Sequence, residues 1–272
     1  MNDDRLEAGF IGAGNMGQAL IAGLVRSGIT VDTIGFAEPV HDRASDLRAR
    51  FPGLVLRGPQ ELAASARTLV LAVKPQMLPQ LAPSLAIEVT ATQPLVVSVA
   101  AGITTDRLAG WLGPETRIVR AMPNTPALIG AGITGLFANP HADDADRNTA
   151  DRLLGAVGTT VWLEDEEQMH AVTATSGSGP AYVFLMVEAM TRAAESLGLD
   201  PATARRLTLA TVTGAARLAV ESGSDPAELR ARVTSPGGTT ERAIAVFEEA
   251  GFPNLVERAM RAAAARSREL GG

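Results

Sequence analysis

The sequence predicts an α/β fold in which a doubly wound parallel sheet comes first and an all-helical domain follows. Short β-branched runs alternate with amphipathic segments up to about Leu163, as in a parallel sheet covered by helices on both faces. Beyond the acidic stretch Glu164–Glu167 the strand signals stop, and long Ala- and Leu-rich segments bounded by Pro and Gly take over. We therefore expect an α/β domain over residues 1–163 and a helical domain over residues 164–272.

Six short apolar runs are the expected strands of the sheet. They are Glu7–Ile11, Thr33–Ala37, Leu54–Leu56, Thr68–Val73, Leu95–Val99 and Arg117–Met122. Helical or turn segments separate each run from the next, which is the arrangement that a doubly wound sheet needs.

Proline, glycine and aspartate mark the helices of the second domain. Pro180 stands in the first turn of a helix that Gly198 ends. The pairs Asp200–Pro201 and Asp225–Pro226 repeat this start, with Asp as the N-cap, and Gly223 is an expected stop.

The first of these helices has no polar stripe. Across Ala181–Val187 the Tyr182 hydroxyl is the one polar side-chain group, so the helix needs cover on all sides. A domain of about 110 residues can hardly surround a helix with its own chain. We therefore expect a second subunit to cover it in a homodimer, with a tight monomeric core as the alternative.

Composition excludes several classes of function. The 272 residues include 30 Asp and Glu against 24 Lys and Arg, so no overall basic field favours nucleic acid. There is no Cys, and the three His are scattered, so we expect no metal site and no thiol chemistry. The start Met1–Asp4 lacks a basic signal region and no apolar run approaches about 18 residues, so we expect a cytoplasmic protein with no membrane partner.

A glycine-rich turn follows the first expected strand. The run Ile11-Gly12-Ala13-Gly14-Asn15-Met16-Gly17 opens the predicted helix Met16–Arg26. Gly12 permits the turn, Gly14 lets a diphosphate approach the backbone, and Gly17 allows close packing of helix on strand. The helix N-terminus adds N–H donors and the positive end of its dipole. This is the fingerprint of a Rossmann dinucleotide site, and a glycine turn without a ligand is the alternative.

Glu38 lies just past the second strand, about 20 residues after Gly17. An acid at this position accepts hydrogen bonds from the adenosine ribose and repels a 2′-phosphate, which favours NAD over NADP. Arg43 and His41 lie close by in the sequence and would partner a 2′-phosphate if the loop turned Glu38 away. A solvated loop acid before Pro39 is the plain alternative.

Two further strand ends carry candidate cofactor contacts. Val73-Lys74-Pro75 follows one strand, and Ala100-Ala101-Gly102 follows the next. Ligands of such sheets bind at the carboxyl ends of the strands. Lys74 suits the cofactor's phosphates or a solvated rim, and the small residues at 100–102 allow close approach of a flat ring.

A second glycine-rich helix start is Ser235-Pro236-Gly237-Gly238-Thr239-Thr240. Its glycines and hydroxyls form a smaller anion site that suits a carboxylate. Ser176-Gly177-Ser178-Gly179-Pro180 opens another helix. Two capped helix starts without a ligand are the alternative. The acidic stretches His141–Asp146 and Glu164–Glu167 are read as solvated helix ends.

Together these segments resemble the pyrroline-5-carboxylate reductase family, which completes proline biosynthesis. The motifs that carry the resemblance are Phe10–Gly17, Ala72–Pro75, Ser98–Gly102, Arg120–Pro126, Ser176–Tyr182 and Ser235–Thr240. They run in order along nearly the whole chain. The last two are specific to the family, whereas many dehydrogenases share the glycine fingerprint.

The resemblance implies a Rossmann domain, a helical domain that interlocks with its partner in a dimer, and an active site at that interface. Rings of dimers occur in the family. The implied reaction is hydride transfer from reduced nicotinamide to the C=N carbon of 1-pyrroline-5-carboxylate, giving L-proline. Members that use NADPH typically carry hydroxyl or basic residues where this chain has Ala37-Glu38-Pro39. Family habit favours NADPH, and Glu38 keeps NADH close behind.

The resemblance also assigns site residues. It gives the substrate carboxylate to the backbone N–H groups of Gly238, Thr239 and Thr240, in the loop that Ser235 opens. The Thr240 hydroxyl is the catalytic contact, at the ring nitrogen. Ser176 and Ser178 would lie near the substrate. Ala100–Gly102 and Met122–Asn124 would lie near the nicotinamide, where Met122 and Asn124 are the expected contacts of the last segment.

Other readings share the two-domain plan. A 3-hydroxyacid dehydrogenase needs a general acid–base, usually Lys, and the segments Ser176–Tyr182 and Ser235–Thr240 contain none. A related imine reductase and a non-catalytic dinucleotide-binding sensor remain as alternatives. A cyclic imine can arrive protonated from water, so hydride addition needs orientation and charge complementarity more than a strong acid. Thr240 is accordingly expected to orient the imine by a hydrogen bond.

Overall fold

The computed structural model describes residues 5–271 and divides into two compact units. The first unit ends at Ser178 and includes the chain again from Ala263 onward, and the second unit is Gly179–Ala262. The domain boundary expected at residues 163/164 stays a prediction.

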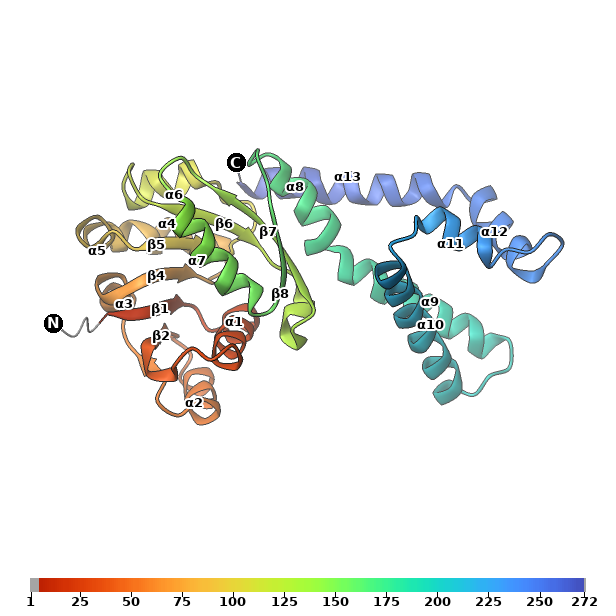
Figure 1. The fold of residues 1–272 in the computed structure, drawn as a ribbon, viewed down its shortest axis with the longest axis horizontal. Helices are drawn as coiled ribbons and strands as arrows, with labels where there is room; N and C mark the ends of the chain where they lie inside the picture. The colour runs from red at the N-terminus through yellow and green to blue at the C-terminus, as the bar shows by residue number, and fades with distance from the viewer. Residues whose placement is uncertain (1–4, 272) are drawn as a thin grey trace. The chain divides into compact units, whose positions relative to one another are not determined.

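An eight-stranded sheet organises the first unit (Figure 1). Its strands are β1 (Leu6–Ile11), β2 (Ile34–Ala37), β3 (Val55–Leu56), β4 (Ala66–Leu71), β5 (Leu95–Ser98), β6 (Ile118–Met122), β7 (Gly132–Ala138) and β8 (Gly158–Trp162). The order is β3-β2-β1-β4-β5-β6-β7-β8, and neighbours run parallel except the antiparallel pair β6–β7. The first six strands have the order of a Rossmann sheet, which confirms the predicted fold class.

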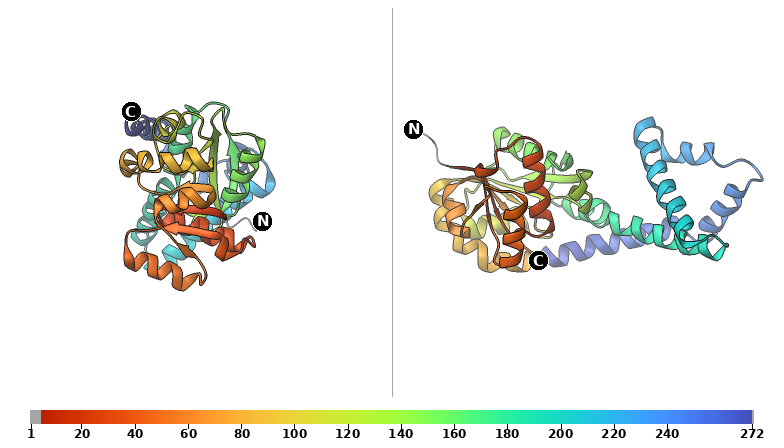
Figure 2. Two further views of the ribbon diagram at one scale, coloured as in Figure 1. Left: turned by 90° about the vertical axis from the view of Figure 1, so that its left-hand side faces the viewer. Right: turned by 90° about the horizontal axis from the view of Figure 1, so that it is seen from below.

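Helices cover both faces of this sheet, as the two further views show (Figure 2). One hydrophobic cluster includes side chains of α1 (Asn15–Arg26), α2 (His41–Arg50) and α7 (Asp144–Gly155). The other includes side chains of α3 (Pro59–Ser65), α4 (Leu78–Leu81), α5 (Ala86–Thr92) and α6 (Thr105–Leu112). Successive strand residues face opposite clusters, as Phe10 and Ile11 do, and this explains why the strands are apolar at every position.

Short helical turns connect these elements. They are η1 (Val31–Thr33), η2 (Pro75–Met77), η3 (Ala82–Leu85) and η4 (Thr125–Ile129), all 3₁₀, and η5 (Thr173–Gly177), which is π-helical and continues α8 (Gln168–Val172). In η5 the Ser178 N–H donates to the Thr173 carbonyl at 2.8 Å. A π-helical turn of this kind frequently marks a functional position.

The acidic stretch Glu164–Glu167 is not a solvated helix end throughout. The Glu166 carboxylate accepts hydrogen bonds from the Thr105 N–H at 2.8 Å and the Thr105 hydroxyl at 2.7 Å. It also pairs with Arg120 Nη1 at 2.8 Å, where the Arg120 side chain is 2% exposed. Asp146 in the other stretch is buried and pairs with Arg117 at 2.8 Å. For these two acids the sequence-based interpretation was wrong, because their partners lie far away in the sequence.

The chain from Ala263 onward is fastened to α8. Ser267 Oγ lies 2.9 Å from His170 Nδ1, and both residues are buried. Arg268 Nε donates to the Glu167 carboxylate at 2.6 Å, and this hydrogen bond lowers the pKa of Glu167. Burial lowers the pKa of His170, and the negative charge of Glu167, which acts to raise this pKa, offsets the effect only in part. The fold therefore favours neutral His170.

The second unit is entirely helical over the residues that the structure describes in it. Its elements are α9 (Gly179–Ser196), α10 (Pro201–Ser222), α11 (Pro226–Arg232), α12 (Thr239–Glu249) and the part of α13 (Phe252–Gly271) that reaches Ala262. Asp200 caps α10 by accepting from the N–H groups of Ala202 and Thr203, and the hydrogen bond from the Thr203 side chain together with these backbone bonds lowers the pKa of Asp200. Asp225 caps α11 through the Ala227 N–H, and Gly223 ends α10 with φ +61°. The predicted caps are confirmed.

The apolar helix α9 packs against α10 yet leaves large side chains uncovered within the chain. Phe184 and Leu185 are each 67% exposed, and Val183 is 47% exposed. An apolar surface of this kind marks an interaction site. Among the described helices none is long and apolar enough to cross a membrane.

Candidate functional site

The predicted cofactor residues lie at the carboxyl ends of five neighbouring strands. The Gly12 N–H donates to the Ala37 carbonyl at 2.9 Å, the Ala72 N–H to Ile11 at 2.8 Å, and the Val99 N–H to Leu71 at 3.1 Å. These bonds place the ends of β1, β2, β4 and β5 side by side. Ile11–Gly14 follow β1, Asn15–Gly17 open α1, Glu38 follows β2, Val73–Pro75 follow β4, Ala100–Gly102 follow β5, and Met122 and Asn124 lie at the end of β6. The structure brings all of them to one edge of the sheet.

Two glycines of the fingerprint are required by the fold itself. Gly12 has φ +98°, and a Cβ there would lie 2.7 Å from the Ala72 carbonyl oxygen. At Gly17 a Cβ would overlap the Gly12 carbonyl oxygen. Any side chain at either position would therefore displace backbone.

Gly14 is different, because the fold does not require it to be glycine. Its backbone is extended, and a Cβ there would meet no atom within 4 Å. It is the N-cap residue of the 12-residue helix α1 and offers no side-chain cap. Open space above a helix N-terminus fits a diphosphate that approaches the backbone N–H groups. The residues present here fit a dinucleotide.

The Glu38 side chain is turned into the glycine turn. Its Oε2 accepts the Ala13 N–H at 3.0 Å, and its Oε1 accepts the Val40 N–H at 3.0 Å and Arg43 Nη1 at 3.1 Å. The side chain is only 3% exposed. The alternative of a solvated loop acid is therefore wrong, and the contact of Glu38 with the ribose stays a prediction.

Asn124 ties the end of β6 to the π-helical turn. Its Oδ1 accepts the Ile133 N–H at 3.0 Å, and its Nδ2 donates to the Ser176 carbonyl at 3.2 Å. Close by, a Cβ at Gly177 would lie 2.5 Å from the Met122 Cε atom, so β6 and the turn are in tight contact. The Ser176 hydroxyl donates to the Val172 carbonyl at 3.1 Å. Ser176 and Ser178 thus belong to the first unit, at the end of β6.

The second glycine-rich loop lies in the second unit. Gly238 is the N-cap of α12, and Thr239 and Thr240 are its first residues. Gly237 has φ +71°, and its N–H donates to Glu241 Oε2 at 2.7 Å. A cavity of about 480 Å³ is lined by Gly237, Gly238, Thr239, Glu241, Arg242 and Ala245. A small carboxylate would find backbone donors here.

Glu241 is a residue of this loop that the sequence-based prediction missed. An acid at the third position of a helix typically reaches back to backbone N–H groups before the helix, and that pattern was the available signal. Ser235, Gly238, Thr239 and Thr240 lie together in this loop.

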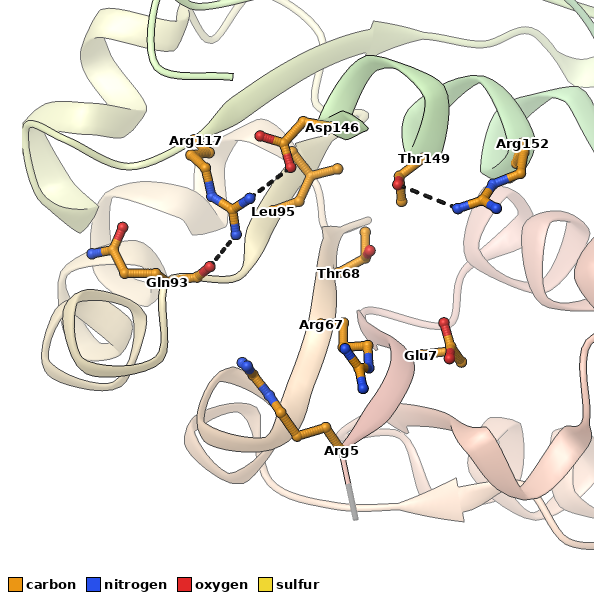
Figure 3. A pocket seen from close by; sticks show the side chains of 10 residues that line it. All are labelled: Arg5, Glu7, Arg67, Thr68, Gln93, Leu95, Arg117, Asp146, Thr149 and Arg152. Carbon is orange, nitrogen blue, oxygen red and sulfur yellow. Dashed lines mark hydrogen bonds and ion pairs between the residues drawn. The ribbon is translucent and has the colours of Figure 1, made fainter. Parts of the chain in front are cut away.

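A separate polar pocket of about 370 Å³ lies at the opposite, amino ends of the strands (Figure 3). Arg5 Nη2 donates to the Ala66 and Thr92 carbonyls at 3.3 and 3.1 Å. Arg117 bonds the Gln93 carbonyl and pairs with Asp146. Because α3 and α5 end at this edge, Arg5 and Arg117 satisfy carbonyl groups that the ends of these two helices leave without a partner within the helix. Arg5 and Arg117 therefore have a structural role in this pocket.

No three His, Asp or Glu side chains within residues 5–271 gather in a way that would hold a metal ion.

Comparisons with known proteins agree with this geometry. A family model described as pyrroline-5-carboxylate reductase dimerisation matches residues 166–270, and one described as NADP oxidoreductase coenzyme F420-dependent matches residues 7–102. The pyrroline-5-carboxylate reductase of Pseudomonas aeruginosa is 49% identical over 261 residues, which cover 96% of this chain and 95% of that protein.

Two solved structures extend the likeness to three dimensions. The pyrroline-5-carboxylate reductase from Coxiella burnetii has a TM-score of 0.92 at 41% identity and covers 98% of this chain and 99% of its own. The Plasmodium falciparum pyrroline carboxylate reductase with NADP bound has a TM-score of 0.88 at 27% identity, with 99% of each chain covered. The likeness holds across nearly the whole chain, and the protein belongs to the pyrroline-5-carboxylate reductase family.

Proposed function

We propose that this chain reduces 1-pyrroline-5-carboxylate to L-proline with a hydride from NAD(P)H, as the final step of proline biosynthesis. The observation that carries the proposal is the open space at Gly14 above the N-terminus of α1, in a chain of this family. In a Rossmann fold the second glycine of the fingerprint lets the backbone approach the pyrophosphate of the cofactor.

The cofactor would be held mainly by backbone. The N–H groups of Gly14–Gly17, at the start of α1, receive the diphosphate, and exposed Lys74 adds a positive charge beside it. Ala100–Gly102, Met122 and Asn124 flank the nicotinamide, with Ile11, Val73 and Pro75 completing the strand ends. The bound cofactor supplies the hydride, and the Asn124 side chain fixes the position of the Ser176 backbone.

The substrate would be bound through its carboxylate and ring nitrogen. The N–H groups of Thr239 and Thr240 receive the carboxylate at the start of α12, since the Gly238 N–H already donates to the Ser235 carbonyl at 3.0 Å. Ser176, Ser178 and Ser235 supply polar groups around the ring. The imine arrives protonated from water, so hydride addition to its C=N carbon gives the neutral amine without a proton from the protein. The Thr240 hydroxyl orients the ring nitrogen, since an ordinary hydroxyl is too weak an acid to do more.

The active assembly would be a homodimer. A second copy covers Val183, Phe184 and Leu185 of α9, which one chain leaves exposed. A larger ring of dimers is part of the proposal by family resemblance. A cytoplasmic location is also part of the proposal.

The test is a steady-state assay with purified protein. NADPH or NADH should be oxidised only when 1-pyrroline-5-carboxylate is present, and absence of turnover with both cofactors would refute the proposal. Thr240→Ala should lower kcat about 10- to 100-fold, the value of a hydrogen bond to a charged group, while cofactor affinity stays within about twofold. Thr240→Ser keeps the hydroxyl and should retain most of the activity. Equal losses of kcat and cofactor affinity in Thr240→Ala would contradict the assigned role.

A further inference from the structure

The carboxylate of Glu38 already has protein partners on both of its oxygens. The Ala13 N–H binds one oxygen, and the Val40 N–H and the Arg43 guanidinium bind the other, all at 3.0 to 3.1 Å. The side chain is 3% exposed, so little of the carboxylate faces solvent. Three of the roughly four acceptor positions of this carboxylate are therefore taken within the chain, so little of it is left for the ribose hydroxyls that its position in the fold suggests.

The guanidinium of Arg43 is in the opposite situation. Arg43 lies in the first turn of α2, its side chain is 44% exposed, and one of its terminal nitrogens is bonded to Glu38. A guanidinium carries five N–H donors arranged as a fork that matches a phosphate, so its pairing with Glu38 leaves donors for a second anion. The start of α2 adds the positive end of a ten-residue helix that has no side-chain cap.

The place of Arg43 in the fold indicates which anion it would meet. In a Rossmann sheet the residue that follows the second strand marks the adenosine ribose, and a nearby Arg accommodates a 2′-phosphate. Arg43 is bonded to that residue. His41, the other basic candidate, is 95% exposed and lies 3.6 Å from Asp42.

We propose that Arg43 binds the 2′-phosphate of NADPH and so selects NADPH over NADH, while Glu38 positions Arg43 and the glycine turn instead of binding the ribose. This inference rests on the proposed function, because it concerns the cofactor of that reaction. It makes an acid after β2 compatible with NADPH, since the Arg43 cation faces the carboxylate that would otherwise repel a 2′-phosphate.

The experiment is a titration of the purified full-length protein with NADPH and with NADH, without substrate, followed by nicotinamide fluorescence. Wild-type protein should bind NADPH at least tenfold more tightly than NADH. Arg43→Ala should weaken NADPH about 10- to 100-fold, as expected for charge-assisted hydrogen bonds, and should change NADH affinity less than about threefold. Arg48→Ala, the same charge change on the same helix, should leave both affinities nearly unaltered and is the matched control.

Glu38→Gln separates the two roles of the acid. The amide oxygen of the substituted side chain can still accept the Ala13 N–H. If Glu38 only positions its neighbours, the NADH affinity of the variant should therefore stay within about threefold of wild type. If Glu38 binds the ribose, the NADH affinity should fall about tenfold. Tighter binding of NADH than NADPH by wild type, equal losses of both cofactors in Arg43→Ala, or the NADH loss in Glu38→Gln would each overturn the proposal. Because no substrate is present, these results stand whether or not the chain reduces 1-pyrroline-5-carboxylate.

Discussion

Glu166→Ala is expected to destabilise the first unit by about 3–5 kcal/mol, because it leaves a buried guanidinium without its carboxylate. Arg120 is 2% exposed and lies 2.8 Å from Glu166, whose side chain is 18% exposed. The same carboxylate accepts the N–H and the hydroxyl of Thr105 at the start of α6, so the substitution removes several charge-assisted bonds at once.

The assay is urea unfolding followed by far-ultraviolet circular dichroism, at one fixed protein concentration because dimer formation makes stability concentration-dependent. Glu167→Ala is the matched control. Because Glu167 is 59% exposed and pairs with Arg268 at the surface, this variant should lose much less unfolding free energy than Glu166→Ala. Replacing Arg120 and Glu166 together by Met and Leu should recover most of the stability. Similar losses for Glu166→Ala and Glu167→Ala would refute the argument from burial.

Two further predictions concern the glycine turn and His170. Gly14→Ala should keep the wild-type melting temperature but weaken NAD(P)H binding at least tenfold, since the added methyl group would fill space that is open in the fold. Gly12→Ala should lose about 1–3 kcal/mol of stability, because the backbone at Gly12 has φ +98°. Calorimetry and cofactor titration of both variants check these expectations, and unimpaired cofactor binding by Gly14→Ala would contradict them. Because burial lowers the pKa of His170 below 6.5, the unfolded chain binds this proton more readily than the folded chain, so the contribution of neutral His170 is present above about pH 6.5 and is lost as pH falls below it. Urea midpoints at pH 7.5 and about 5.5 should therefore differ less in His170→Gln than in wild type, and equal differences would contradict the assignment.

The sequence predicted the first six strands because their signals are local. Apolar runs such as Leu95–Ser98 and a glycine fingerprint beside β1 need no knowledge of distant partners. β7 and β8 were not among the predicted strands, because glycines such as Gly132 and Gly135 weaken the strand pattern. The structure gives the reason for Gly135: a Cβ there would lie 2.7 Å from Val172 Cγ1 in a neighbouring element.

The same distinction applies to the site. The cofactor residues could be brought together from sequence because parallel strands end at the same edge of a sheet. The partners of Glu38 and Glu166 could not, since a Glu is usually exposed and only the folded chain brings Ala13 or Arg120 to it. The roles of Gly238–Thr240 rested on family resemblance, because a helix start alone does not identify its ligand.

The most direct test of the central claim follows the hydride itself. NADPH and NADH deuterated at the transferable C4 position of the nicotinamide are each incubated with the protein and unlabelled 1-pyrroline-5-carboxylate, and the product is analysed by mass spectrometry. Hydride transfer to the C=N carbon predicts L-proline that carries one deuterium. The label should lie on the ring carbon next to nitrogen that does not bear the carboxylate, and labelled proline should form at the same rate as the cofactor is oxidised. Formation of no proline with either cofactor, or of proline without the label, would contradict the account.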